Sequence, residues 1–232
     1  MNRIAVVCEG HTEQGFVGAV LCPHFATLGA HVVPKLVETS RDIRGVQRQG
    51  GHVSPPKLIN QIKSLCASFD YVTMMFDYYG FSTNWPPMTK LPSSPNERKA
   101  QIEAIMRTAV GSPRFIPNLI MHEFEGLLFS GPDAIAQTCK TIVKNEADLI
   151  HRLSQITIRF QSPEHINDSP DTAPSKRIAK LLPGYDKVLH GPRIAQNIGL
   201  ASIRQHCNAF DGWLLRLEDL CRDTANQREE SD

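Results

Sequence analysis

The fold is decided near the N-terminus, where residues 4–10 read Ile-Ala-Val-Val-Cys-Glu-Gly. Five apolar residues in a row are typical of a strand that is covered on both faces, as the strands of parallel sheets are. The polar segment that follows at once, beginning with Glu9 and Gly10, predicts a tight turn and a helix capped by Thr12. A strand, a tight turn and a helix in this order are typical of an α/β fold.

The alternation of strands and helices continues through the first half of the chain. Strands are predicted over residues 31–37, 71–76 and 115–121. Helices are predicted over residues 55–66, 95–110, 146–160 and 175–222. Pro34 removes a backbone donor, which favours a place at the sheet edge for the strand that contains it.

Beyond Asp133 the helical patterns dominate. We therefore predict an α/β core over residues 1–135, with a mostly parallel central sheet flanked by helices. Residues 136–232 are predicted to form a helical C-terminal extension that packs on this core.

Composition sets few limits on function. The chain has 232 residues, of which 41% are hydrophobic and 21% charged, and its net charge of +1 gives no argument for a nucleic-acid partner. No run of eighteen apolar residues and no basic leader are present, so we expect a cytoplasmic protein without a membrane span. The six cysteines form no C-x-x-C pair, and we expect reduced thiols.

Acidic residues follow the predicted strands. Glu9 and Asp77 come directly after strands, and Glu123 and Glu125 lie where residues 115–121 hand over to the next segment. The carboxyl ends of parallel strands lie at one edge of a sheet, so these acids could meet there. Crowded carboxylates are tolerated mainly when a cation neutralises them, and oxygen ligands favour Mg²⁺ or Mn²⁺.

A divalent metal of this kind clamps phosphate oxygens, which makes phosphodiester cleavage the natural reaction class. Glu9 or Glu123 could also act as the general base. Glu123 and Glu125 cannot share one helix face, so only one of them would enter the site if their segment is helical, and we favour Glu123. Taken singly, each acid could equally be a helix cap or a solvated loop residue.

Residues that could contact a nucleic-acid phosphate lie in three places. Gly10 would let a backbone amide approach a phosphate closely. Lys176 and Arg177 lie at the start of a predicted helix, and Arg44 lies in a basic loop. Sequences for a P-loop, a dinucleotide-binding turn and an α/β-hydrolase nucleophile are all missing.

Four segments of the chain resemble the motifs of a known family. They read Val-Cys-Glu-Gly-His-Thr-Glu at residues 7–13, Phe-Asp-Tyr-Tyr-Gly at 76–80, His-Glu-Phe-Glu-Gly-Leu-Leu-Phe at 122–129 and Pro-Ser-Lys-Arg-Ile at 174–178. These segments are similar to the V-E-G-x-T-E, F-D-Y-Y-G, H-E-F-E-A-L-L-F and P-S-K-R-I motifs of a bacterial family of unknown function that is related to the TOPRIM fold.

The resemblance also implies an activity, because TOPRIM domains occur in overcoming-lysogenization-defect nucleases. It implies that Glu9 is the acid/base glutamate and that Asp77 is a metal ligand. Tyr79 occupies the second acidic position of the usual D-x-D pair, so Glu123 or Glu125 would have to supply the missing carboxylate. An ATPase partner in phage defence is implied by the resemblance only.

Three hypotheses follow from the sequence. The first is a Mg²⁺-dependent nuclease that acts on DNA or RNA. The second is a non-enzymatic regulatory or adaptor subunit that binds an ATPase or a nucleic acid. The third is a metal-dependent hydrolase of small phosphorylated molecules. The sequence leaves the oligomeric state open.

Overall fold

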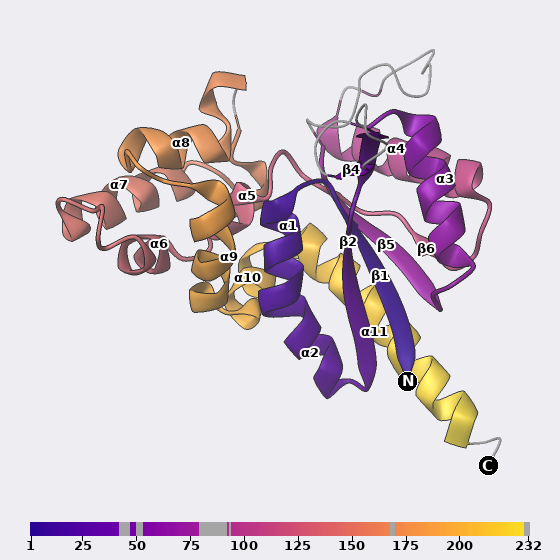
Figure 1. Cartoon of the computed structure of the whole chain (residues 1–232). Helices are drawn as coiled ribbons and strands as arrows, with labels where there is room; N and C mark the ends of the chain where they lie inside the picture. Colours follow the sequence, from indigo (N-terminus) through magenta and orange to yellow (C-terminus); the bar gives the residue numbers. More distant parts are fainter. Residues whose placement is uncertain (42–46, 50–52, 79–91, 93, 168–169, 230–232) are drawn as a thin grey trace. The chain divides into compact units, whose positions relative to one another are not determined.

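A five-stranded sheet forms the centre of the fold in the computed structural model, which describes residues 1–41, 47–49, 53–78, 92, 94–167 and 170–229 (Figure 1). The strands follow the order β2-β1-β5-β6, with β7 also paired to β5. The pairs β1–β2, β1–β5 and β5–β6 are all parallel. The predicted α/β fold with a mostly parallel sheet flanked by helices is therefore confirmed.

Backbone contacts divide the chain into two units. Unit 1 contains Met1–Leu119 together with Glu218–Asp232, and unit 2 contains Ile120–Leu217. The sequence instead predicted a division after residue 135. Asn2 and His24 explain part of the difference, because their side chains bond to Leu220 and Glu218 in the middle of the last helix. Local patterns show that a segment is helical but not which unit it joins.

Strand β1 (Asn2–Cys8) lies between β2 (Ala30–Leu36) and β5 (Tyr71–Asp77). The five consecutive residues 4–8 of β1 are all buried, as the continuous apolar run predicted. A two-stranded antiparallel sheet of β3 (Glu38–Arg41) and β4 (Gln47–Gln49) follows β2 and was not predicted.

Strand β2 lies at the edge of the sheet, as Pro34 predicted. In its parallel pairing with β1, even-numbered residues direct their backbone groups away from β1. The thiol of Cys22 donates to the Val32 carbonyl at 3.2 Å, and the side-chain amide of Gln61 donates to the Leu36 carbonyl at 3.0 Å. Pro34 has no N–H, so this edge offers few free groups to another strand.

One predicted strand is divided in the structure. In place of a single strand over residues 115–121, β6 (Phe115–Ile116) and β7 (Leu119–Ile120) are separated by Pro117 and Asn118. Proline cannot donate to a strand ladder, which explains the break. The side chain of Asn118 donates to the Met74 carbonyl of β5 at 3.4 Å.

Helices cover both faces of the sheet in unit 1 (Figure 1). α3 (Pro55–Cys66) and α4 (Pro95–Val110) begin and end as predicted, with Gly111 at φ +66° after α4. Their buried residues form one cluster with alternate residues of β1 and β5, Ala5, Val7, Val72 and Met74.

The other face is covered by the segment that follows β1. It consists of α1 (His11–Phe16), a π-helical turn (Val17–Leu21) and α2 (Cys22–Thr27). Gly10, and not Thr12, is the residue before the first helical turn. Pro23 lies in the first turn of α2, and Gly29 at φ +69° follows its end.

Unit 2 is helical. Its elements are α5 (Glu125–Leu128), α6 (Pro132–Thr138), α7 (Glu146–Thr157), two 3₁₀ turns (Pro163–His165 and Pro170–Thr172), α8 (Pro174–Leu181), α9 (Lys187–Ile198), α10 (Leu200–His206) and the first part of α11 (Asn208–Glu229). The buried side chains of Phe124, Phe129, Phe210 and Trp213 are among the largest in its core.

Two further observations bear on the expectations from composition. All six cysteines are free thiols, and five of them are buried. No helix in the described part of the chain has both the length and the apolar character that a membrane span requires.

Candidate functional site

Glu9 and Asp77 meet at the carboxyl ends of two neighbouring strands. Cys8 of β1 and Met75 of β5 stand opposite each other, so the residues that follow them are also close. The Glu9 amide donates to the Met75 carbonyl at 3.2 Å, and the Asp77 amide donates to Oε2 of Glu9 at 3.1 Å. Both acids are half-buried, so their side chains are accessible in part. The structure thus brings together the first two predicted site residues.

Gly10 is engaged in the start of α1. Its amide donates to Oε2 of Glu13 at 2.8 Å, and the Glu13 side chain is buried. A Cβ on Gly10 would lie 3.1 Å from that same oxygen, which is a tight contact. In this arrangement the amide of Gly10 serves the helix start, whereas the sequence suggested that it would face a phosphate.

Two residues of the sequence hypothesis lie outside the described residues. They are Arg44, proposed to contact phosphate, and Tyr79, which replaces the second acid of the D-x-D pair.

Glu123 and Glu125 lie around the start of α5 in unit 2. Oε2 of Glu123 accepts a hydrogen bond at 2.9 Å from the Ser175 amide, in the first turn of α8. Glu125 is buried, with 2% of its surface exposed. Glu123 precedes α5 and does not belong to it. The expectation that only one of the two acids could enter a site assumed that both lie on one helix, so it does not apply.

Tyr185 connects these two acids electrostatically. Burial raises the pKa of its hydroxyl above the ordinary value, and the charge of Glu125, with smaller contributions that include Glu123, raises it further.

His122, directly before Glu123, has an unusual backbone conformation. Its φ is +65°, which makes it the one described residue other than glycine with a positive φ. The left-handed region is costly for most side chains, and such residues are found more often at functional sites. The pKa of His122 is lowered to about 4, mainly by burial and to a smaller extent by the charge of His165, while the charge of Glu123 opposes the shift.

Lys176 and Arg177 have different environments in α8. The Lys176 ammonium is exposed and lies 3.6 Å from Asp171. The Arg177 guanidinium donates to the Thr172 carbonyl at 2.5 Å and lies over the Phe160 ring, 5.5 Å from its centroid. Lys176 can reach a ligand in solvent, whereas Arg177 is held against the protein.

The acids of unit 1 fit a divalent cation as a pair. Within either unit, the described residues include no group of three or more His, Cys, Asp or Glu side chains placed to hold a metal. Mg²⁺ is commonly held by one or two carboxylates, with water and substrate phosphate as its other ligands. Glu9 and Asp77 are neighbours through the bond from the Asp77 amide to Oε2 of Glu9, and both are half-buried, so they supply a donor set of that kind.

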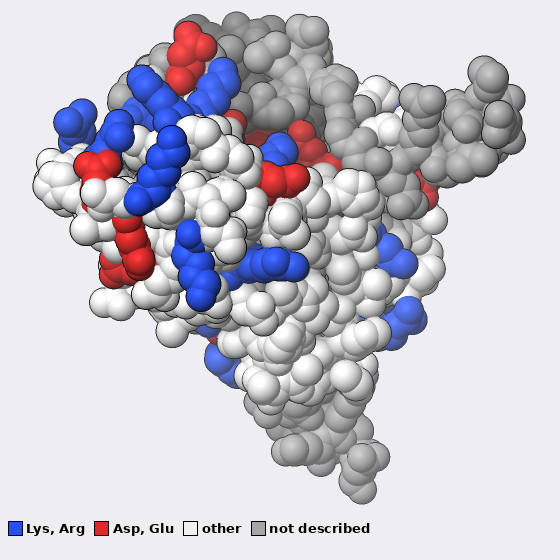
Figure 2. Space-filling view, turned by 60° about the vertical axis from the view of Figure 1, so that its left-hand side comes forward, with Lys and Arg blue, Asp and Glu red and all other residues white. Residues whose placement is uncertain are grey.

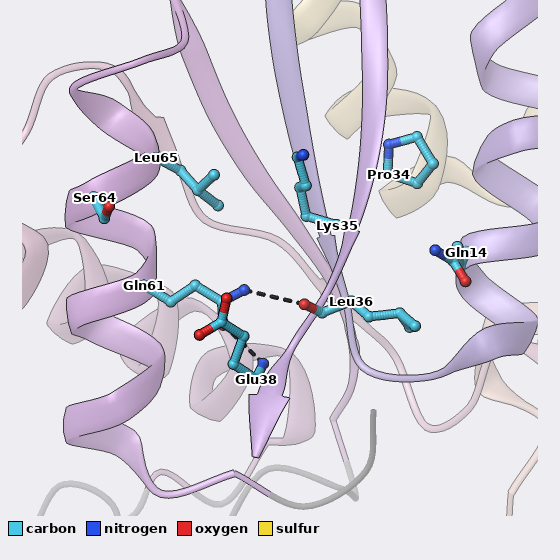
Figure 3. Close-up of a pocket in the computed structure, with 8 residues that line it drawn as sticks. All are labelled: Gln14, Pro34, Lys35, Leu36, Glu38, Gln61, Ser64 and Leu65. Carbon is cyan, nitrogen blue, oxygen red and sulfur yellow. Dashed lines mark hydrogen bonds between the residues drawn. The ribbon is translucent and has the colours of Figure 1, made fainter. Parts of the chain in front are cut away.

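A polar pocket of about 430 Å³ lies beside the edge strand β2 (Figure 3). It is lined by Gln14, Pro34, Lys35, Leu36, Glu38, Gln61, Ser64 and Leu65. The Gln61 side chain donates to the Leu36 carbonyl and accepts from the Glu38 amide, both at 3.0 Å. This amide therefore joins the end of β2 to the start of β3. The Glu9 carboxylate contacts Asp77, on the opposite side of β1 from this pocket.

Sequence reasoning missed Glu164 and Tyr185. Both oxygens of the buried Glu164 accept backbone hydrogen bonds, from Ala209 and Phe210 at 2.9 Å each, at the start of α11. Partners 45 and 46 residues away leave no local pattern that could have shown this role. Tyr185 lies in a turn between two helices and carries no motif.

The fold and the strand-end acids define an α/β protein with a candidate carboxylate site at the edge of a parallel sheet. The chain belongs to the family described as "Domain of unknown function (DUF4276)", whose model matches residues 8–218. Membership of a family of unknown function, which the four motifs predicted, is thereby confirmed. A comparison with curated proteins found no match.

The chain is also similar to solved structures of OLD proteins. The C-terminal region of the Burkholderia pseudomallei OLD protein has 14% sequence identity and a TM-score of 0.45, covering 95% of this chain and 99% of that one. The C-terminal region of the Xanthomonas campestris pv. campestris OLD protein, phased with iodine, has 13% identity and a TM-score of 0.42, covering 93% and 98%.

Proposed function

We propose that this chain is a divalent-metal-dependent nuclease, in which Glu9 and Asp77 hold Mg²⁺ or Mn²⁺. The observation that carries the proposal is the meeting of these two acids at the carboxyl ends of β1 and β5, with the Asp77 amide 3.1 Å from Oε2 of Glu9. Sites in parallel sheets form at this edge. The four sequence motifs, which resemble those of a TOPRIM-related family, support the same assignment.

The roles of the chain's own residues follow from their positions. The Asp77 amide orients the Glu9 carboxylate by holding one of its oxygens. The other Glu9 oxygen and the Asp77 carboxylate would then be the metal ligands. When bound, the cation would neutralise phosphate oxygens and polarise the phosphorus toward attack. Glu9 or Glu123 would accept the proton of the attacking water.

Further roles are proposed for residues of unit 2 from the sequence motifs. Glu123 and Glu125 are assigned as further metal ligands because they belong to the H-E-F-E motif. Lys176 is assigned to a substrate phosphate because its ammonium is exposed. Arg177 is assigned with it from the same motif. Arg44 remains a proposed phosphate contact, whereas the Gly10 amide is used by Glu13. We place this activity in the cytoplasm, in phage defence beside an ATPase partner, by resemblance to the motif family.

The test is a cleavage assay on single-stranded DNA, duplex DNA and RNA with added Mg²⁺ or Mn²⁺. Glu9→Gln and Asp77→Asn should each reduce the cleavage rate by about 100-fold or more, because each removes a negatively charged ligand. Asp70→Asn is the matched control, since Asp70 is exposed and precedes the other end of β5, where it accepts from the Arg3 amide at 2.8 Å. Full activity in both site variants would exclude the proposal.

A regulatory or adaptor subunit is the second candidate. It is favoured by the structural work that several acids already perform: Glu13 holds the Gly10 amide and Glu123 holds the Ser175 amide. Under this proposal the chain binds an ATPase or a nucleic acid without cleaving it. Binding that survives in Glu9→Gln and Asp77→Asn, with no turnover by the native chain, would support it. Hydrolysis of small phosphate esters alone would favour a metabolite hydrolase instead.

A further inference from the structure

Exposed cations gather on two adjacent helices of unit 2. Figure 2 turns the helices of this unit toward the viewer and shows several Lys and Arg side chains on that face. Four of the exposed cations belong to α7, to the residues just after it, or to α8: Arg152, Arg159, Lys176 and Lys180. We refer to these four residues as the α7–α8 basic surface.

The amphipathic pattern of each helix places these cations in solvent. In α8, Pro174 and Ile178 are buried, whereas Lys176 and Lys180 lie one turn apart on the exposed side. In α7, Leu149 and Leu153 form the buried side and Arg152 is exposed. The cations are therefore not used to hold the helices in place.

Arg177 of α8 contacts a residue that follows α7. Its guanidinium lies over the ring of Phe160, which follows the end of α7, and donates to the Thr172 carbonyl. The contact places Phe160, which follows Arg159 in the chain, against Arg177 of α8. Arginine over an aromatic face is a favourable packing contact, so Arg177 helps to hold α8 against the residues that follow α7.

The acids near the surface compete weakly for its cations. Arg152 lies 3.7 Å from Asp148, and Lys176 lies 3.6 Å from Asp171. The side chains of both ion pairs are more than half exposed, with exposed fractions from 54% to 97%. Exposed ion pairs of this kind are weak, so a polyanion with closely spaced charges can replace the carboxylates.

We infer that the α7–α8 basic surface binds the phosphate backbone of a nucleic acid. The inference rests on the proposed function, because it assigns a docking surface for the same substrate class. Contacts of this kind supply affinity and orientation through release of counterions, and they do not read the base sequence. The surface should therefore bind different sequences with similar affinity.

The test is fluorescence anisotropy with a fluorescein-labelled single-stranded DNA oligonucleotide and with its duplex. Every chain carries Glu9→Gln, so that cleavage does not alter the probe, and no metal is added. The double variant Arg159→Gln and Lys180→Gln is compared with Lys63→Gln and Arg107→Gln, a pair with the same charge change on the exposed sides of α3 and α4.

We plot the logarithm of the association constant against the logarithm of the salt concentration, between about 50 and 200 mM KCl. The slope is negative, and we expect it to become shallower by about two in the surface variant. The control pair should leave this slope unchanged. Equal slopes in the two double variants would overturn the inference. An acidic polyglutamate that binds as tightly as the oligonucleotide would also overturn it, in favour of a protein partner.

The outcome is separable from that of the cleavage assay. If the surface variant loses binding but the native chain cleaves nothing, the docking surface stands and the nuclease proposal fails. If the native chain cleaves and the surface variant binds and cleaves normally, the nuclease proposal stands and the docking surface fails.

Discussion

The carboxylates of the two units differ in what they face. In unit 1, Glu9 and Asp77 are half-buried at the ends of parallel strands, and Oε2 of Glu9 accepts one backbone amide. In unit 2, Glu123 and Glu164 accept amides in the first turns of α8 and α11. The pair in unit 1 stands at the sheet edge where the sites of parallel sheets form, whereas the pair in unit 2 stabilises helix starts.

The comparison teaches that acidic residues in one sequence acquire their roles from their neighbours. A carboxylate that faces helix amides is satisfied by the protein itself. Two carboxylates side by side at a sheet edge repel each other, and a cation relieves the repulsion. The predictions below test how much Glu123, Glu164 and the neighbouring His122 contribute to stability in unit 2, and whether Glu9 and Asp77 bind a common cation.

The largest effect on stability is expected from His122, next to the acids of unit 2. Its pKa is lowered to about 4, mainly by burial, from an ordinary 6.5. Between these two values the unfolded chain binds more protons than the folded chain, so stability is complete above pH 6.5 and falls as the pH drops toward 4. The loss should reach about 3 kcal/mol.

Urea unfolding at about pH 7 and about pH 4.5 measures this loss. His122→Asn should lose less stability than the native chain over that interval, because asparagine tolerates a positive φ and does not titrate. His206→Asn, at an exposed position in α10, is the control and should behave like the native chain. Identical pH dependence in His122→Asn and the native chain would show that His122 does not cause the loss.

Glu164→Gln should have the next largest effect. One of the two oxygens that accept from Ala209 and Phe210 would become an NH₂ group facing an N–H donor. A buried donor without an acceptor costs about 2 kcal/mol of unfolding free energy. Thermal or urea unfolding would report the change, with Glu146→Gln in the exposed first turn of α7 as the control. Equal stability of the two variants would remove Glu164 from the structural group.

Glu123→Ala should have the smallest effect on stability. It removes the acceptor of the Ser175 amide from the first turn of α8, which should cost about 1 kcal/mol. Glu123→Gln keeps an amide oxygen and should cost less. Hydrogen exchange at the Ser175 amide should be faster in Glu123→Ala than in Glu123→Gln. No difference between them would mean that Glu123 does not stabilise this helix start.

Much of unit 1 could be predicted from sequence, because its signals are local. The apolar runs predicted β1 and β5, Pro34 predicted the edge position of β2, and Pro95 predicted the start of α4. The meeting of Glu9 and Asp77 followed from one general rule, that parallel strands end at the same edge.

The rest depended on contacts that sequence patterns do not encode. The bond from Ser175 to Glu123 joins residues 52 apart, and the return of the end of α11 to unit 1 depends on His24 and Glu218, 194 apart. Pro117, which separates β6 from β7, is present in the sequence, but the apolar residues on both sides of it predicted a single strand.

The most direct test of the central claim is Mn²⁺ binding, measured by electron paramagnetic resonance on the native chain, Glu9→Gln, Asp77→Asn and Asp70→Asn. If Glu9 and Asp77 both hold the cation, the native chain and Asp70→Asn should bind Mn²⁺ with equal affinity. Either site variant should weaken Mn²⁺ binding by about tenfold or more. Equal Mn²⁺ affinity in all four chains, or no binding by the native chain, would contradict the claim that Glu9 and Asp77 hold a common cation.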